Sequence, residues 1–139
     1  MPKKICVIDG QGGGIGSAII KKLKEVYGES VEIIALGTNA IATAQMLKAK
    51  ANRGASGENA IVRTTLTADL IAGPLSIVLA HAMMGEVTPA MAAAVAASPA
   101  PKVLLPLNQE QVTVAGASAM PLPHLVDEMV EIHIRRYIG

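Results

Sequence analysis

The chain has 139 residues, 51% of them hydrophobic, and a formal net charge of +1. This length suits a single domain, 1–139, that buries its own core. A charge near zero, with no Phe, no Trp and two Tyr, excludes the basic, aromatic surface typical of nucleic-acid binding. One cysteine, Cys6, excludes an intrachain disulfide and a cysteine zinc site, and we expect it to be a small buried apolar residue.

The start of the chain predicts no export or membrane signal. Met1–Lys4 leads directly into an apolar run, and the most apolar stretch, 70–87, is interrupted by Pro74, His81 and Glu86. We therefore expect a soluble, cytoplasmic protein that contacts no membrane.

The first elements along the chain are the clearest. Residues 5–8 form an apolar run that predicts a buried strand, and a glycine cluster follows it. Apolar residues then recur at helical spacing from Ile15 to Val26, and Gly28 ends the predicted helix. The remaining predicted elements are a strand at 31–36, a helix at 40–50 capped by Thr38 or Asn39, a loop at 51–57, a short helix from Glu58, a strand at 68–72, a helix at 75–84, a helix at 90–97 capped by Thr88, strands at 102–107 and 112–115, and a last helix from Pro121 or Pro123 to about Tyr137.

This alternation of strands and helices predicts a three-layer, Rossmann-like, doubly wound α/β fold with a mainly parallel sheet. The short link before 112–115 predicts an antiparallel edge strand there. The strand order stays open between 2-1-3-4, with the fifth strand at an edge, and a Rossmann-type 3-2-1-4. Apolar residues cover more than half of the last helix, which predicts a homo-oligomer through the C-terminal helix.

The glycine turn is the feature with the most specific chemistry. Its residues are Asp9, Gly10, Gln11, Gly12, Gly13, Gly14, Ile15 and Gly16. Glycines admit positive φ angles and a close anion, and the N-terminus of the following helix offers unpaired N–H groups. We expect a nucleotide phosphate on this turn; the alternative is that the glycines only permit a tight bend. In a doubly wound sheet, ligands lie beyond the C-terminal strand ends, which adds Thr38, Asn39, Gly73, Pro74 and Asn108 as candidate contacts.

Residues Gly10, Gly14, Ile15 and Gly16 resemble the Gly-x-x-x-Gly-Ile-Gly turn of the short-chain dehydrogenases and reductases, over about residues 3–37. This resemblance implies NAD or NADP as the ligand, with another adenine nucleotide or FMN as further candidates. The whole chain is also similar to a family of small bacterial proteins of unknown function. The segments that carry this second similarity are 8–16, 35–40, 57–60, 85–89 and 121–124.

Three features depart from the dehydrogenase pattern. No carboxylate follows the second strand to bind a ribose diol, although Arg53 offers a contact for a 2′-phosphate. A Tyr-x-x-x-Lys pair is also missing. Finally, Asp9 either accepts hydrogen bonds from the loop amides, in competition with a phosphate, or holds a magnesium ion against one.

No catalytic constellation is identifiable, and whether the protein is an enzyme stays open. His81 lies on an apolar segment and is expected in the core, while Glu86 is a candidate for a buried or site-facing carboxylate. No spacing of His, Asp and Glu matches a metal site. The expected function is nucleotide or dinucleotide binding, and the alternative is a non-catalytic, oligomeric assembly module.

Overall fold

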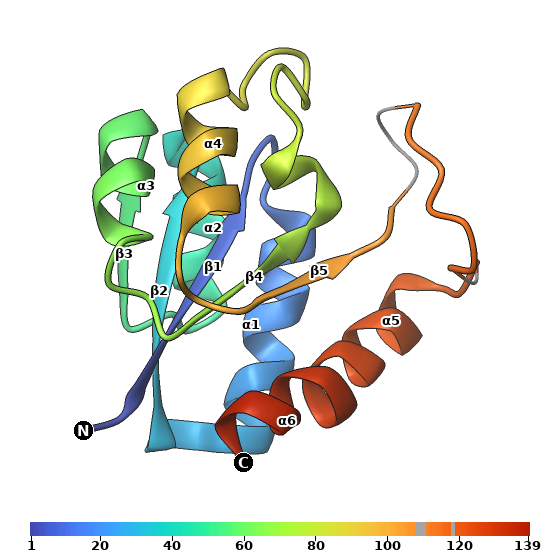
Figure 1. Cartoon of the computed structure of the whole chain (residues 1–139). Helices are drawn as coiled ribbons and strands as arrows, with labels where there is room; N and C mark the ends of the chain where they lie inside the picture. Colours follow the sequence, from blue (N-terminus) through green and yellow to red (C-terminus); the bar gives the residue numbers. More distant parts are fainter. Residues whose placement is uncertain (108–110, 118) are drawn as a thin grey trace.

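A computed structural model of the chain describes residues 1–107, 111–117 and 119–139 (Figure 1). One sheet in the order β3-β2-β1-β4-β5 occupies the centre, and all four strand pairings are parallel. The strands are β1 Lys3–Asp9, β2 Val31–Gly37, β3 Arg53–Ser56, β4 Leu70–Pro74 and β5 Lys102–Leu105. The strands expected at 31–36, 5–8, 68–72 and 102–107 thus lie side by side in this order, which is 2-1-3-4, the first of the two orders considered. The unexpected β3 adds a strand beside β2, so the order counted over all five strands is of the Rossmann type, 3-2-1-4-5.

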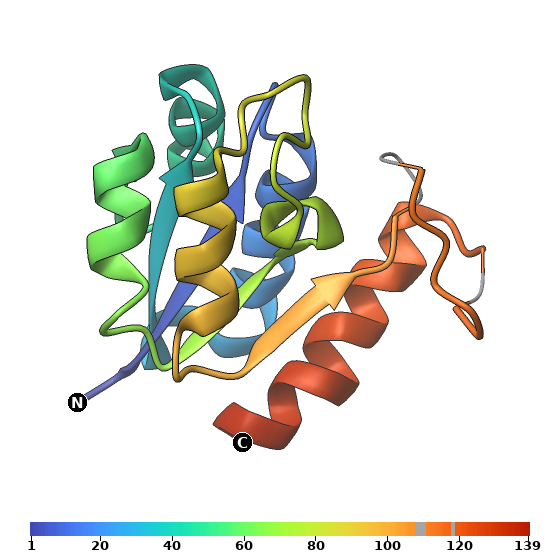
Figure 2. The same ribbon diagram turned by 45° about the horizontal axis from the view of Figure 1, so that its top comes forward.

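Helices cover both faces of this sheet, which confirms the three-layer α/β fold (Figure 2). One face carries α1, α2 and the C-terminal helix, and the other carries α3, α4 and the segment between β4 and α4. The helical elements are α1 Gly14–Tyr27, η1 Gly28–Ser30, α2 Ala40–Lys48, α3 Glu58–Thr64, η2 Leu75–Val78, α4 Pro89–Ala97, α5 Leu122–Glu128, the π-helical η3 Met129–Ile134 and α6 Arg135–Ile138.

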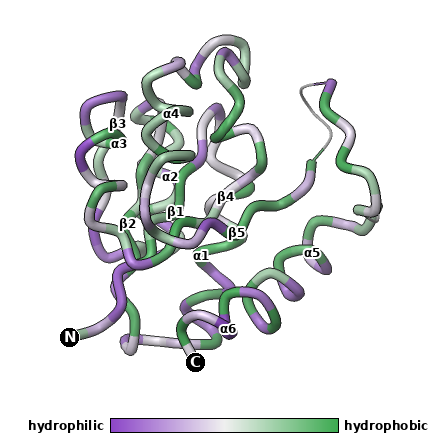
Figure 3. Tube along the Cα trace, in the orientation of Figure 1, coloured by the Kyte–Doolittle hydropathy of each residue, from purple (hydrophilic) through white to green (hydrophobic). Residues whose placement is uncertain are grey.

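The central strands are buried on both faces because helices lie above and below them. Residues 5–8 of β1 are 0–1% exposed, and their side chains divide between two apolar clusters, one on each face. In Figure 3, the apolar colour along β1, β2 and β4 marks these buried strands. Cys6 is fully buried, as expected, and burial raises the pKa of its thiol to about 12. The central sheet thus forms a rigid support for the loops at its C-terminal edge.

The two edges of the sheet differ from the prediction. β3 lies at 53–56, inside the predicted loop, because this exposed strand is held by backbone pairing to β2 rather than by buried apolar side chains. Residues 112–115 form no strand, although their β-branched composition predicted one. Within the described residues the sheet has no antiparallel strand, and β5 pairs with β4 in parallel.

The helix predicted at 75–84 is also wrong in extent. Only Leu75–Val78 is helical, as one 3₁₀ turn, and turns follow it up to Thr88. His81, Met83 and Met84 have φ angles of 69°, 57° and 57°, which a continuing right-handed helix does not allow. The segment 79–87 is called the strap below.

The C-terminal helix buries most of its apolar residues within the chain. It packs on α1 and β5, and Leu125, Val126, Met129, Val130 and Ile134 are 0–6% exposed. Ile132 and Tyr137 stay about half exposed, at 53% and 51%. Two neighbouring elements therefore bury more of this helix than one sheet face alone does, and association through it stays a prediction. Among the described helices, none has the length and apolar character needed to cross a bilayer.

Candidate functional site

The glycine turn lies at the C-terminal edge of the sheet, directly after the central strand β1. From β1 the chain proceeds to β2 and β3 on one side, and β4 and β5 lie on the other. The strand order thus reverses between β1 and β4. In open α/β sheets this reversal leaves a crevice at the C-terminal strand ends where ligands bind.

Asp9 fastens both ends of the turn. Its carboxylate accepts a 2.8 Å hydrogen bond from the Gly10 N–H and a 2.7 Å one from the Gly16 N–H, and its side chain is buried at 3% exposure. Burial raises the pKa of this carboxyl, while hydrogen bonds from the amides of Gly16, Gly10 and Ile15 oppose the rise. Asp9 therefore takes the inner amides for the protein itself, as one of the two alternatives expected. Over the described residues, no group of three His, Cys, Asp or Glu could hold a metal ion.

At three of the five positions in the turn, the folded chain itself requires glycine. Gly13 takes a left-handed φ of 74°, and a side chain there would meet the backbone of Ala42. A side chain at Gly16 would collide with Met46, and one at Gly10 would collide with several groups of the strap and of the loop after β2. These positions need glycine for the turn and for close packing.

Gly12 and Gly14 are different. Both are exposed, neither takes a positive φ, and a Cβ at either would have no atom within 4 Å. Within the described residues, no hydrogen bond is recorded for their backbone N–H groups. The fold itself thus places no demand for glycine at these two positions, and it leaves their amides open to a ligand.

Glu86 reaches the turn from the strap. Its Oε1 oxygen accepts hydrogen bonds from the Gln11 N–H at 2.8 Å, the Thr38 hydroxyl at 2.7 Å and the Asn39 side-chain amide at 2.8 Å. These three hydrogen bonds lower the pKa of the half-buried carboxyl, although burial opposes the change. Glu86 is therefore a site-facing carboxylate, one of the two roles considered for it.

The strap packs against the glycine turn and the loop after β2. Met83 lies against Gly10, since its sulfur is one of the atoms that a Cβ at Gly10 would meet. His81 is exposed on the strap rather than buried in the core, so the expectation of a core histidine is wrong. His81 has a left-handed φ of 69° within a tight turn, and this turn buries the next residues, Ala82 and Met83, while the His81 side chain stays exposed.

The other candidate residues lie at strand ends but differ in access. Thr38 and Asn39 follow β2 and are half-buried, and Asn39 caps α2 through a 2.8 Å bond from Ala42 N–H. Gly73 and Pro74 end β4 and are buried. Asn108 lies outside the described residues.

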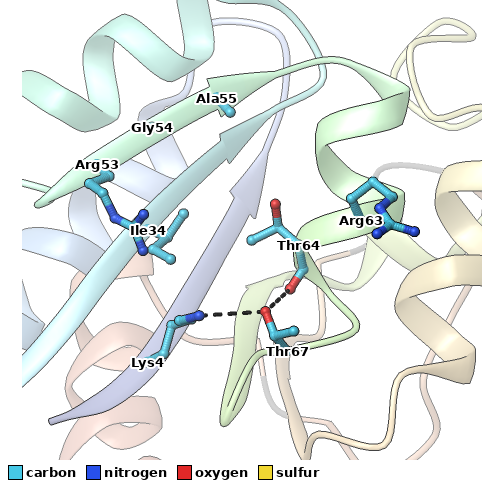
Figure 4. Close-up of a pocket in the computed structure, with 8 residues that line it drawn as sticks. All are labelled: Lys4, Ile34, Arg53, Gly54, Ala55, Arg63, Thr64 and Thr67. Carbon is cyan, nitrogen blue, oxygen red and sulfur yellow. Dashed lines mark hydrogen bonds between the residues drawn. The ribbon is translucent and has the colours of Figure 1, made fainter. Parts of the chain in front are cut away.

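Arg53 does not lie at this edge. It begins β3, pairs with Glu32 at 3.4 Å, and lines an open groove of about 390 Å³ together with Lys4 (Figure 4). The 2′-phosphate contact considered for Arg53 is therefore wrong for this site. The full lining of the groove is Lys4, Ile34, Arg53, Gly54, Ala55, Arg63, Thr64 and Thr67.

The sequence indicated the turn. It did not indicate the contacts that separate the glycines required by the fold from Gly12 and Gly14. The link between Glu86 and Gln11 spans 75 residues and left no local pattern. Its only signal was an isolated carboxylate between apolar segments.

Comparisons with known proteins define the family. Residues 4–137 match the family model described as a domain of unknown function, DUF3842, and the chain belongs to this family. A comparison with curated proteins gave no significant match. Among solved structures, a universal stress protein in complex with cAMP is similar at 19% identity and a TM-score of 0.42, over 75% of this chain and 97% of that chain. At that level the similarity carries no conclusion about function.

Proposed function

We propose that this protein binds a nucleotide at the C-terminal edge of its sheet, with a phosphate on the amides of Gly12 and Gly14. One observation carries the proposal. Neither a backbone conformation nor close packing requires glycine at these two positions, and within the described residues their N–H groups donate no hydrogen bond. A ligand that approaches the backbone closely supplies the missing reason.

The physical setting favours an anion at this point. α1 has 14 residues, so its first turn carries unpaired N–H groups and about half a positive charge. Asp9 neutralises the inner part of that end, at the Gly10 and Gly16 amides, and leaves the outer amides of Gly12 and Gly14. The ligand phosphate is therefore expected on the outer side of the turn, next to solvent.

NAD or NADP is the first candidate, on the resemblance of the turn to dehydrogenases and reductases and on the Rossmann strand order. Other adenine nucleotides and FMN are the next candidates. In the part of the chain that the structure describes, no group of three His, Cys, Asp or Glu could hold a metal ion. The proposal concerns binding and assigns no reaction.

The proposal is tested by isothermal titration of the purified protein with NAD, NADP, ATP, AMP and FMN, combined with native mass spectrometry for a copurified nucleotide. We expect at least one of these nucleotides to bind with 1:1 stoichiometry. Gly14→Val is expected to abolish that binding, because the valine side chain would occupy the open space beside the Gly12 and Gly14 amides. Binding that is equally tight in both proteins would contradict the proposal.

A second candidate function, assembly into a homo-oligomer, is favoured by the exposed Ile132 and Tyr137 on the C-terminal helix. Light scattering after size exclusion tests it. An oligomer that dissociates on Ile132→Ser would support association through this helix, and a monomer at high concentration would contradict it.

A further inference from the structure

Three hydrogen-bond donors from two separate parts of the chain converge on one oxygen atom. They are the N–H of Gln11 in the glycine turn, the hydroxyl of Thr38 and the side-chain amide of Asn39, both in the loop after β2. Their distances to the Oε1 oxygen of Glu86 are 2.8, 2.7 and 2.8 Å. We call these three donors the oxyanion cradle.

The cradle is chemically suited to a charged oxygen. A neutral acceptor needs one or two donors, whereas three donors on one oxygen are typical of an ionised carboxylate or phosphate. Asn39 is itself held in place, since its Oδ1 accepts from Ala42 N–H and its Nδ2 also donates to the Gln11 carbonyl at 3.1 Å. Asn39 and Gln11 thus keep their positions through contacts that do not involve Glu86.

We propose that the oxyanion cradle binds a phosphate of the ligand, and that Glu86 occupies this place until the ligand replaces it. This inference rests on the proposed nucleotide binding and extends it to a second phosphate contact. Gln11 and Gly12 are adjacent in the turn, so the cradle and the outer amides form one continuous surface.

The strap that carries Glu86 is suited to release. Four of its residues, His81, Met83, Met84 and Gly85, have positive φ angles between 57° and 91°. Such conformations are strained in non-glycine residues and are concentrated at ligand clamps and switch regions. Met84 is 95% exposed, whereas Ala82, Met83 and Val87 are buried. We therefore expect Glu86 and the exposed residues 84–85 to move while the buried part of the strap stays in place. The release of Glu86 therefore costs mainly its hydrogen bonds, which the incoming phosphate replaces.

The cradle is tested with inorganic phosphate and Glu86→Ala, so that the result does not depend on nucleotide binding. In ¹H–¹⁵N spectra we expect phosphate to shift the Gln11 amide of this variant with at least tenfold tighter affinity than in the unchanged protein. Adding Thr38→Val to Glu86→Ala is expected to weaken phosphate binding again. The absence of a phosphate-dependent shift at Gln11 in Glu86→Ala would overturn the proposal.

Two further variants control for folding. Glu58→Ala removes a comparable carboxylate, which accepts a hydrogen bond from Thr88 at 2.6 Å, and is expected to leave phosphate binding unchanged. If Glu86→Ala does not fold, Glu86→Gln retains the shape and loses the charge. It is expected to bind phosphate more tightly than the unchanged protein, and weaker or equal binding would overturn the cradle.

Titrations with pairs of nucleotides identify which phosphate of the ligand the cradle binds. Tighter binding of NADP than of NAD assigns the cradle to a ribose phosphate, and tighter binding of AMP than of adenosine, with NADP equal to NAD, assigns it to a 5′-phosphate. Weaker binding of every nucleotide to Glu86→Ala would mean that Glu86 itself contacts the ligand, and would overturn its role as an occupant. The proposed function can fail independently of the cradle. It is tested by nucleotide titration of the Gly14 variant, whereas the cradle is tested by phosphate titration observed at the Gln11 amide.

Discussion

The Oε1 oxygen of Glu86 lies 2.8 Å from the backbone nitrogen of Gln11, although 75 residues separate them in the chain. This hydrogen bond joins the strap to the glycine turn. The protein thus places its own carboxylate beside Gln11, next to the Gly12 amide that donates no hydrogen bond within the described residues.

The contribution of Glu86 to stability is expected to depend on pH. Its pKa in the folded protein is lowered from the ordinary 4.5 by its three donors, so its stabilising effect is present above that value. The effect is lost as the pH falls through the lowered pKa. At neutral pH, Glu86→Gln is expected to reduce the free energy of unfolding by about 1 kcal/mol. Urea unfolding of both proteins from pH 7 to pH 3 measures the difference, and a difference that grows on acidification would contradict the prediction.

Asp9→Asn is expected to destabilise the fold by about 1–3 kcal/mol, because an amide can accept from only one of the two flanking N–H groups. Its NH₂ group would then face either the Gly10 or the Gly16 amide, which leaves a buried donor without an acceptor. Denaturant unfolding measures the loss. Glu29→Gln is the matched control at an exposed carboxylate and is expected to change stability by less than about 0.5 kcal/mol. Equal effects of the two substitutions would argue against the anchoring role.

Gly14→Ala is expected to separate folding from binding. Since a Cβ at this position meets nothing and the backbone is helical, the substitution is expected to preserve stability or to raise it by about 0.4–1 kcal/mol. The same methyl group obstructs the outer amides, so nucleotide affinity is expected to fall at least tenfold, or by about 1.4 kcal/mol. Thermal unfolding and titration calorimetry on one preparation check both expectations. A variant that loses stability and keeps its nucleotide affinity would show that Gly14 is needed for folding and not for binding.

Gly10→Ala is expected to behave in the opposite way to Gly14→Ala. Its Cβ would meet Thr38 and Met83 and lie 3.0 Å from Glu86 Oε1, so the strap must shift. Overpacking of this kind costs about 1–3 kcal/mol. Hydrogen exchange at the strap amides, together with denaturant unfolding, measures the displacement. An unchanged exchange rate and an unchanged stability would show that the strap does not press on the turn.

The core of the fold was predictable because its signals are local. The apolar run of β1, the glycine cluster and the periodicity of α1 follow one another directly, and Asn39 and Thr88 cap helices as the sequence indicates. The edges were not predictable for the opposite reason. β3 has only exposed side chains and exists through its backbone pairing with β2, which no hydrophobic pattern records.

The site was predictable only in part. The sequence located the turn and the ends of β2 and β4, since parallel strands place their C-terminal ends together. It did not distinguish Gly12 and Gly14 from the glycines that the fold requires, because that difference depends on distant neighbours such as Ala42 and Met46. The contact between Glu86 and the turn depends on the left-handed turns of the strap, and these occur at His81 and Met83 rather than only at glycine.

The most direct test of the account is a ¹H–¹⁵N titration of the whole protein with the nucleotide that calorimetry identifies. Hydrogen bonding to a phosphate is expected to move the Gly12 and Gly14 amide signals downfield, while the Asp9-bonded amide of Gly16 moves less. Gly14→Ala is expected to suppress these shifts at the same nucleotide concentration. A nucleotide that binds without moving Gly12 or Gly14, or the absence of binding by any nucleotide, would contradict the account.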